Sequence, residues 1–202
     1  MRWLAALAAL AFLTGSDAFA RPSVYALSAH AVDEGCAAGS FSVVTSPDGS
    51  AISVLFDNFA VKGTEANGGF ARTTCAVEIP LHLPEGYSLG VYRVDYRGFA
   101  HLDDKQRAQM NVDYGLMRHN HSRRFRRDIK GAYDGDFTFN ERLGAGLMKR
   151  AGCGDDAVLN FSASLILESR VGPGQATMSL DSIDGAPQGG LIFGLDLKKC
   201  RG

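Results

Sequence analysis

The feature that most constrains the fold of this chain is an alternation of apolar and polar residues across positions 75–98. In the first half, apolar side chains occupy every second position from Cys75 to Leu83, and in the second half Tyr92, Val94 and Tyr96 alternate with charged residues. The Pro-Glu-Gly sequence at 84–86 supplies the restricted and then the permissive backbone of a tight turn. A period of two places one row of side chains on a buried face, so the stretch predicts two β-strands joined as a hairpin.

The same period recurs along the chain and indicates the fold class. Gly- and Pro-containing turns separate the alternating stretches, and no helical period is sustained. We therefore predict an all-β fold, an antiparallel β-sandwich of jelly-roll or Greek-key type with roughly eight to ten strands and two disulfides. The further stretches expected to form strands are residues 41–45, 51–57, 108–116, 159–167, 176–180 and 191–197.

The N-terminus has the pattern of a secretory signal peptide. Arg2 precedes an apolar run at 3–13, and Ala18-Phe19-Ala20 forms a small-x-small cleavage site. The apolar run is too short to span a bilayer, and no later stretch resembles a transmembrane segment. We expect residues 1–20 to be removed and residues 21–202 to form a single secreted domain, extracellular or, in a bacterium, periplasmic.

All four cysteines lie beyond the predicted cleavage site, where an oxidising compartment favours disulfides. Four cysteines allow three pairings. We favour Cys36 with Cys75 and Cys153 with Cys200, because each pair then brackets a contiguous run of predicted strands. A zinc site is the competing interpretation, but the chain contains no CxxC sequence and the spacings are long.

The most unusual composition is the basic run at residues 118–130, which carries six Lys or Arg and one acid. Its charge of +5 leaves −6 on the remainder of a chain whose net charge is −1. We expect this run to lie in a hairpin, and the basic hairpin is a candidate contact for an anionic polymer or surface, because arginine binds sulfate, phosphate and carboxylate bidentately. A solvated tip and a site of proteolytic processing are the alternatives. The candidate contact residues are Arg118, Arg123, Arg124, Phe125, Arg126, Arg127 and Lys130.

No motif predicts a cofactor or a catalytic centre. The chain lacks a GxSxG elbow, a His-Glu zinc helix and a phosphate loop. His119 and His121 would share a face of a strand, but no third metal ligand lies nearby, and the aspartates beside glycines, such as Asp134 and Asp136, are ordinary turn residues. We therefore expect no cofactor, metal or catalytic residue, and the net charge of −1 does not favour nucleic acid as a partner.

Several motifs together give a resemblance to a known family. These are GCxxGS at residues 35–40, SPDGSAISVLFDNF at 46–59, PEGY at 84–87, VDYRG at 94–98, DSIDG at 181–185 and the terminal KKC. The chain resembles domain of unknown function 4360, a family of small secreted proteins of fungi and bacteria. The resemblance implies export, a β-rich fold and paired cysteines, and it brings no established activity. The basic run differs from the Ser/Thr-rich stretch of the family at this place.

These observations lead to one functional hypothesis and one alternative. The chain is expected to be a non-enzymatic extracellular or cell-surface binding protein that contacts an anionic polysaccharide or surface component through the basic hairpin. The alternative is a carbohydrate-active enzyme with two carboxylates in a cleft. The two differ in surface shape, because an enzyme needs a concave pocket with converging acids and a binder of this kind needs a basic patch.

Overall fold

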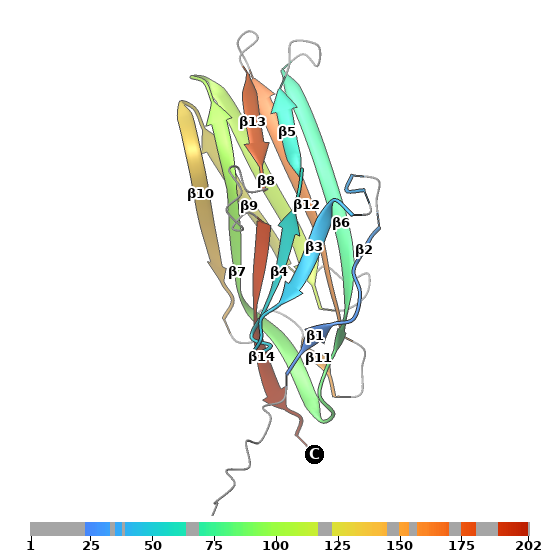
Figure 1. The fold of residues 1–202 in the computed structure, drawn as a ribbon. Coiled ribbons are helices and arrows are strands. Elements are labelled where there is room, and N and C mark those ends of the chain that lie inside the picture. Colours follow the sequence, from blue (N-terminus) through green and yellow to red (C-terminus); the bar gives the residue numbers. More distant parts are fainter. Residues whose placement is uncertain are drawn as a thin grey trace, which may run out of the picture.

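A computed structural model of the protein describes residues 23–32, 35–37, 39–63, 69–116, 123–144, 150–153, 157–169, 175–180 and 190–201. Within these ranges every regular element is a β-strand, and the strands pack as two antiparallel sheets in an elongated sandwich (Figure 1). The predicted all-β sandwich is confirmed. The described part of the chain contains no helix that could cross a membrane.

The first sheet has six strands. Its main path runs β1, β6, β12, β8, β9, and β2 also pairs with β6. The strand at the end of this path, β9, has a described neighbour only on its β8 side. The bounds are β1 (Tyr25–Ala26), β2 (His30–Ala31), β6 (Phe70–His82), β8 (Gln106–Gly115), β9 (Arg123–Lys130) and β12 (Ala157–Ser169).

The second sheet has eight strands and is organised around the 16-residue strand β7. Its path is β3, β4, β14, β7, β13, β5, while β10 and β11 pair with β7 as well. The bounds are β3 (Phe41–Thr45), β4 (Ala51–Phe56), β5 (Ala60–Gly63), β7 (Tyr87–Leu102), β10 (Tyr133–Arg142), β11 (Ala151–Gly152), β13 (Ala176–Ser179) and β14 (Gly190–Lys199).

The structure describes more strands than predicted, fourteen rather than eight to ten. Three of them, β1, β2 and β11, have two residues each. A period of two cannot be recognised in so short a segment, so pairing with a longer neighbour defines these strands rather than their own sequence. The predicted hairpin of β3 and β4 is confirmed by its register, with Phe41 opposite Phe56 and Thr45 opposite Ile52.

The predicted hairpin across residues 75–98 is wrong, although both of its arms are strands. The first arm, β6, belongs to the six-stranded sheet and the second, β7, to the eight-stranded sheet. Tyr87 donates its backbone N–H to the Pro84 carbonyl at 3.2 Å, and Gly86 has a φ of 73°. The tight turn therefore carries the chain from one layer to the other, and each arm buries its apolar row from its own side of the core.

Aromatic side chains from both sheets meet in the core. Tyr114 of the first sheet contacts Phe193 of the second edge-on at 5.8 Å between ring centroids, and Phe161 lies 6.0 Å from Phe193. All three side chains are buried. Each such ring removes roughly 150–250 Å² from water, so this cluster is a major source of the attraction between the layers.

Both favoured disulfides are present. Cys36 bonds Cys75 with a Cα–Cα distance of 5.0 Å, and Cys153 bonds Cys200 with a Cα–Cα distance of 5.8 Å. The second lies beside the turn between the sheets, where the backbone N–H of Cys200 donates to Gly86 O at 2.8 Å. One disulfide fixes the N-terminal segment to β6, and the other fixes the C-terminal strand beside the β6–β7 turn.

Candidate functional site

The basic run does lie in a β-hairpin, but most of it is an edge strand rather than a tip. Residues 123–130 form β9, which pairs with β8 in a register that sets Arg124 opposite Asp113 and Lys130 opposite Arg107. Arg118, with the histidines at 119 and 121, lies outside the described residues. Together β8 and β9 carry six Lys or Arg and two Asp, a formal charge of +4.

One face of β9 points into the sandwich. Phe125 and Ile129 are 3% and 7% exposed, and Phe125 stacks on Tyr96 of the opposite sheet with ring centroids 3.9 Å apart. The expectation that Phe125 contacts a ligand therefore needs correction, because its ring is part of the core. Arg127 lies between these two residues on the same face, with its guanidinium carbon 4.5 Å from the Phe125 ring centroid.

Arg123 ends in a half-buried polar cluster between the edges of the two sheets. Its Nη2 donates to Glu141 Oε1 at 2.8 Å, while the hydroxyls of Tyr96 and Tyr114 donate to Glu141 Oε2 at 3.1 and 2.8 Å. Burial, together with the neighbouring Glu141, raises the pKa of both tyrosines, so they stay neutral donors. Arg123 is thus paired with a carboxylate inside the protein, and we do not count it among the cations available to a ligand.

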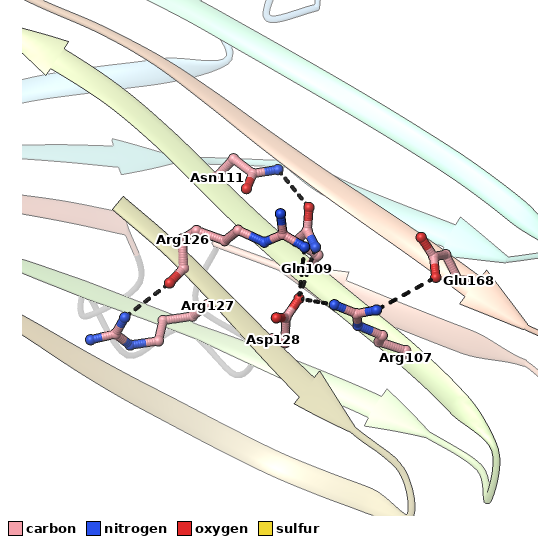
Figure 2. Close-up of polar contacts among 7 residues, drawn as sticks. All are labelled: Arg107, Gln109, Asn111, Arg126, Arg127, Asp128 and Glu168. Atoms are coloured by element: carbon pink, nitrogen blue, oxygen red, sulfur yellow. Dashed lines mark hydrogen bonds and ion pairs between the residues drawn. The ribbon is translucent and has the colours of Figure 1, made fainter. Parts of the chain in front are cut away.

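The other face of β9 points to solvent, and two of its residues belong to ion pairs. Arg124 grips Asp113 with two nitrogens, Nε to Oδ1 at 2.6 Å and Nη2 to Oδ2 at 3.2 Å. Asp128 accepts hydrogen bonds from Arg107 Nη2 at 2.7 Å and Gln109 Nε2 at 2.8 Å (Figure 2). Partial burial alone would raise the pKa of Asp128, but these hydrogen bonds and the nearby guanidiniums outweigh it and lower the pKa.

Three cations of β9 have no close carboxylate partner among the described residues. Arg126 is 56% exposed and only approaches Asp128, at 3.9 Å. Arg127 donates to the backbone carbonyl of Arg126 at 2.9 Å and is otherwise exposed (Figure 2). Lys130 is exposed and forms no ion pair within the described part of the chain. These three side chains are the part of the predicted contact set that is free to bind an anion.

A shallow hollow of about 310 Å³, which Arg126 helps to line, lies on the outer face of the six-stranded sheet. Every side chain that lines it is polar, and the residues come from four neighbouring strands. A hollow built only from such groups suits a ligand rich in charge and hydroxyls. The lining residues are Arg72 of β6, the serines 162 and 164 of β12, Gln109, Asn111 and Asp113 of β8, and Arg124 and Arg126 of β9.

A second hollow, of about 650 Å³, lies toward the other end of β8 and β9. Lys105, Arg107 and Lys130 supply positive charge there, and Asp104 and Glu168 supply two carboxylates. Arg107 Nη1 lies 4.0 Å from Glu168 Oε2. The two hollows border the same pair of strands, so cations accompany β8 and β9 along much of their length.

Sequence reasoning missed the contribution of β6 and β12 to this face. Arg72 donates from Nε to Ser164 Oγ at 2.9 Å, across a register in which Arg72 is opposite Ile166. The signal was the polar half of the alternation at 160–168, whose serines had to face away from the core if the leucines faced toward it. Nothing in the linear sequence indicated that β6 and β8 would flank this strand.

The residues considered as metal ligands can be placed in part. Within the described residues no group of three His, Cys, Asp or Glu is placed to hold a metal ion. Asp134 is paired with His101 across β10 and β7 at 3.1 Å, as an exposed contact. Asp181 and Asp184 fall in residues that the structure does not describe.

Comparison with solved structures finds a distant similarity. A structure of the carbohydrate-binding module TmCBM61 in complex with β-1,4-galactotriose is 12% identical to this chain. The match covers 85% of this chain and 87% of that one, with a TM-score of 0.28.

Comparison with known sequences supports the family resemblance. An uncharacterised secreted protein of Arthroderma benhamiae (strain ATCC MYA-4681 / CBS 112371) is 24% identical over 151 residues, which is 74% of this chain. The aligned region spans 62% of that relative's length. The two disulfides and the secreted relative confirm that this is an exported protein, while the signal peptide itself stays a prediction. The model of domain of unknown function DUF4360 matches residues 25–200, and the chain therefore belongs to this family.

Proposed function

We propose that this protein is a non-enzymatic extracellular or cell-surface binding protein that holds an anionic polysaccharide along the outer side of the β8–β9 hairpin. The observation that carries the proposal is the pair of exposed cations on this side of β9 without a close carboxylate, namely Arg126 and Lys130. They stand on a hairpin of charge +4 in a chain of net charge −1. Charge separated in this way attracts a polyanion locally while the protein as a whole is nearly neutral.

The spacing of the strand suits a repeating ligand. Side chains on one face of an antiparallel strand recur about every 6.8 Å, twice the rise of about 3.4 Å per residue. Arg124, Arg126 and Lys130 occupy three positions of such a row on β9, and Asp128 occupies the fourth. An extended chain with regularly spaced anionic groups can contact several of these positions at once, so weak single contacts add up.

The nature of the neighbouring side chains favours a polysaccharide over a nucleic acid. Proteins that bind single strands combine basic residues with aromatic rings on which bases stack. The solvent-facing positions of β8 and β9 hold Arg, Lys, Gln, Asn, Asp and Gly, and no aromatic residue. Amide and carboxylate groups of this kind are partners for sugar hydroxyls.

Retention on immobilised heparin tests the proposal. The mature protein is expected to bind at low salt and to elute as salt screens the contact, because exposed charges are screened within about 10 Å at 0.1 M. The double substitution Arg126→Glu and Lys130→Glu is expected to abolish retention. Lys62→Glu with Lys199→Glu is the matched control, since it makes the same charge change on exposed lysines of the other sheet. Equal loss in both pairs would show that only net charge matters and would reject the hairpin as the site.

One observation favours the alternative of a carbohydrate-active enzyme. The larger hollow contains two carboxylates, Asp104 and Glu168, and glycoside hydrolysis ordinarily uses two such groups. Release of reducing ends from a panel of plant, fungal and bacterial polysaccharides measures this activity directly. Activity that disappears in Glu168→Gln and persists in Glu141→Gln would replace binding with catalysis as the function.

A further inference from the structure

The side chains that line the 310 Å³ hollow are arranged in rows that follow from strand register. In one row across the sheet, Arg126 of β9 is opposite Asn111 of β8, which is opposite Ser164 of β12. In the next row Arg124, Asp113 and Ser162 occupy the same three strands. Neighbouring strands lie about 4.8 Å apart and these rows about 6.8 Å apart, so the hollow is only a few side chains wide.

Differences in side-chain length create the hollow. On β12 the outward residues are the short Ser162 and Ser164, whereas Arg126 on one side and Arg72 on the other are long. Arg72 leans over this floor and donates to Ser164 Oγ at 2.9 Å. The floor is therefore made of hydroxyls and the two walls end in guanidinium groups.

The chemical content of the hollow is more specific than that of a general anion site. Arg72 has no carboxylate partner among the described residues, and Arg126 only approaches one, at 3.9 Å. Beside them, Asp113 and the side-chain amides of Asn111 and Gln109 present oxygen acceptors. A site for bare sulfate or phosphate needs donors only, whereas acceptors beside guanidiniums suit a ligand that also has hydroxyl groups to donate.

We infer that this hollow is the subsite for one uronic acid residue of an acidic polysaccharide. The planar carboxylate of the sugar pairs with the guanidinium of Arg126 or Arg72, since that geometry allows two parallel hydrogen bonds. Its ring hydroxyls contact the serine floor and the acceptors on β8. The inference rests on the proposed function and narrows it from any polyanion to one that contains hexuronate.

Calorimetric titration with an oligogalacturonate of four to six residues tests this subsite. The free-acid form is expected to bind, and the fully methyl-esterified form to bind at least about tenfold more weakly, because it keeps the hydroxyls and loses the charge. Arg126→Gln and Arg72→Gln are each expected to weaken binding by about tenfold to a hundredfold, the range for a hydrogen bond to a charged group.

A filling substitution separates the subsite from general charge attraction. Ser162→Ile places a bulky, strand-compatible side chain on the floor without changing any charge, and is expected to remove oligogalacturonate binding while leaving heparin retention intact. Ser53→Ile is the matched control, a half-buried serine on β4 in the other sheet. Unfolding curves establish that both variants fold, and if Ser162→Ile does not, the exposed Arg72→Lys provides the comparison, because it keeps the charge and loses the planar fork that pairs with a carboxylate.

The outcomes distinguish the two levels of the proposal. Retention on heparin without binding of oligogalacturonate would overturn the subsite and leave the polyanion function standing. Unchanged oligogalacturonate binding in folded Ser162→Ile, or equal binding of the acid and the ester, would also overturn it. Failure of the unmodified protein to bind either ligand would overturn both.

Discussion

Each face of β9 carries two arginines, but the surroundings of the two faces differ. On the inner side Arg123 is held by Glu141, and Phe125 is stacked on Tyr96. On the outer side Arg126 and Lys130 are exposed, and among the described residues the only ion pair of either side chain is the 3.9 Å approach of Arg126 to Asp128. Arginines of one short strand therefore either serve the folded structure or remain available, and the carboxylates within reach decide which, because Arg124 on the outer side is also paired, with Asp113.

This difference shows why a count of charges overstates a binding surface. Six Lys and Arg residues in a run suggest six contacts, but Arg123 and Arg124 each have a close carboxylate, and Arg118 lies outside the described residues. Ion pairs at the surface contribute little to stability, whereas pairs sheltered between sheets are costly to break. Substitutions on the two faces should therefore affect different properties.

The largest expected effect is on the inner face, where Phe125→Ala removes a buried ring. The loss is expected to be about 3–5 kcal/mol in the free energy of unfolding, because the substitution leaves a cavity beside Tyr96. Denaturation in urea measures it. Arg126→Ala on the opposite face of the strand is the control, and a similar loss in both variants would mean that the two faces are not distinct.

Glu141→Gln is expected to have the next largest effect. The glutamine side chain can still accept hydrogen bonds from Tyr96 and Tyr114, but the charge that balances Arg123 is lost. We expect a loss of about 2 kcal/mol in the free energy of unfolding, which is below the range for a fully buried pair because Arg123 is 28% exposed. Glu168→Gln, an ion-pair acid on the outer face, provides the comparison. A loss no greater than that of Glu168→Gln would contradict a structural role for the cluster.

A smaller effect is expected from Asp128 as the pH is lowered. Its pKa is lower in the folded protein than the model-peptide value of 3.8, so its contribution to stability is complete above about pH 4 and is lost as the pH falls through the folded pKa. The difference in unfolding free energy between the unmodified protein and Asp128→Asn, less than about 1 kcal/mol at neutral pH, should thus shrink as the pH falls below 3.8 and through the lower folded pKa. A difference that is constant over this interval would argue against the hydrogen bonds from Arg107 and Gln109.

The smallest effect on stability is expected for Arg126→Gln combined with Lys130→Gln. Surface substitutions away from buried contacts usually change stability by no more than about 0.5 kcal/mol. The same pair should nevertheless lower the salt concentration needed to elute the protein from heparin, whereas Asp128→Asn should raise it by removing a negative charge. Melting temperature and elution salt are measured on the same variants, so that effects on stability and on binding can be compared. An unchanged elution position would place the binding surface elsewhere.

Much of the fold was predictable, because the alternation of apolar and polar residues indicates which side chains of a strand are buried. The apolar rows at 75–83 and 159–167 became buried rows of β6 and β12, and the disulfides followed from the order of the cysteines. What the alternation does not record is the sheet to which a strand belongs. Both arms of residues 75–98 have the correct period, and only the three-dimensional packing shows that the turn joins two layers.

The candidate site was predictable only in part, for the same reason. In β9 the alternate positions Phe125, Arg127 and Ile129 lie on one face, which indicates an inward-facing row. In β10 the alternate positions Phe137, Phe139 and Glu141 form a similar row. Read in this way, the sequence contains the signal that Phe125 is buried. The meeting of Arg72, Ser164, Asn111 and Arg126 depends on strand order and register across four strands, which a linear pattern does not specify.

The position of β9 at the end of the six-stranded sheet has a consequence for the behaviour of the protein at high concentration. An edge strand presents unpaired backbone groups that invite a second copy to add to the sheet. Positive side chains along such an edge repel an identical edge, so the same arginines and lysine keep secreted copies apart. A polyanion that neutralises them would also remove this protection, and bridging of copies into larger assemblies would then compete with simple binding.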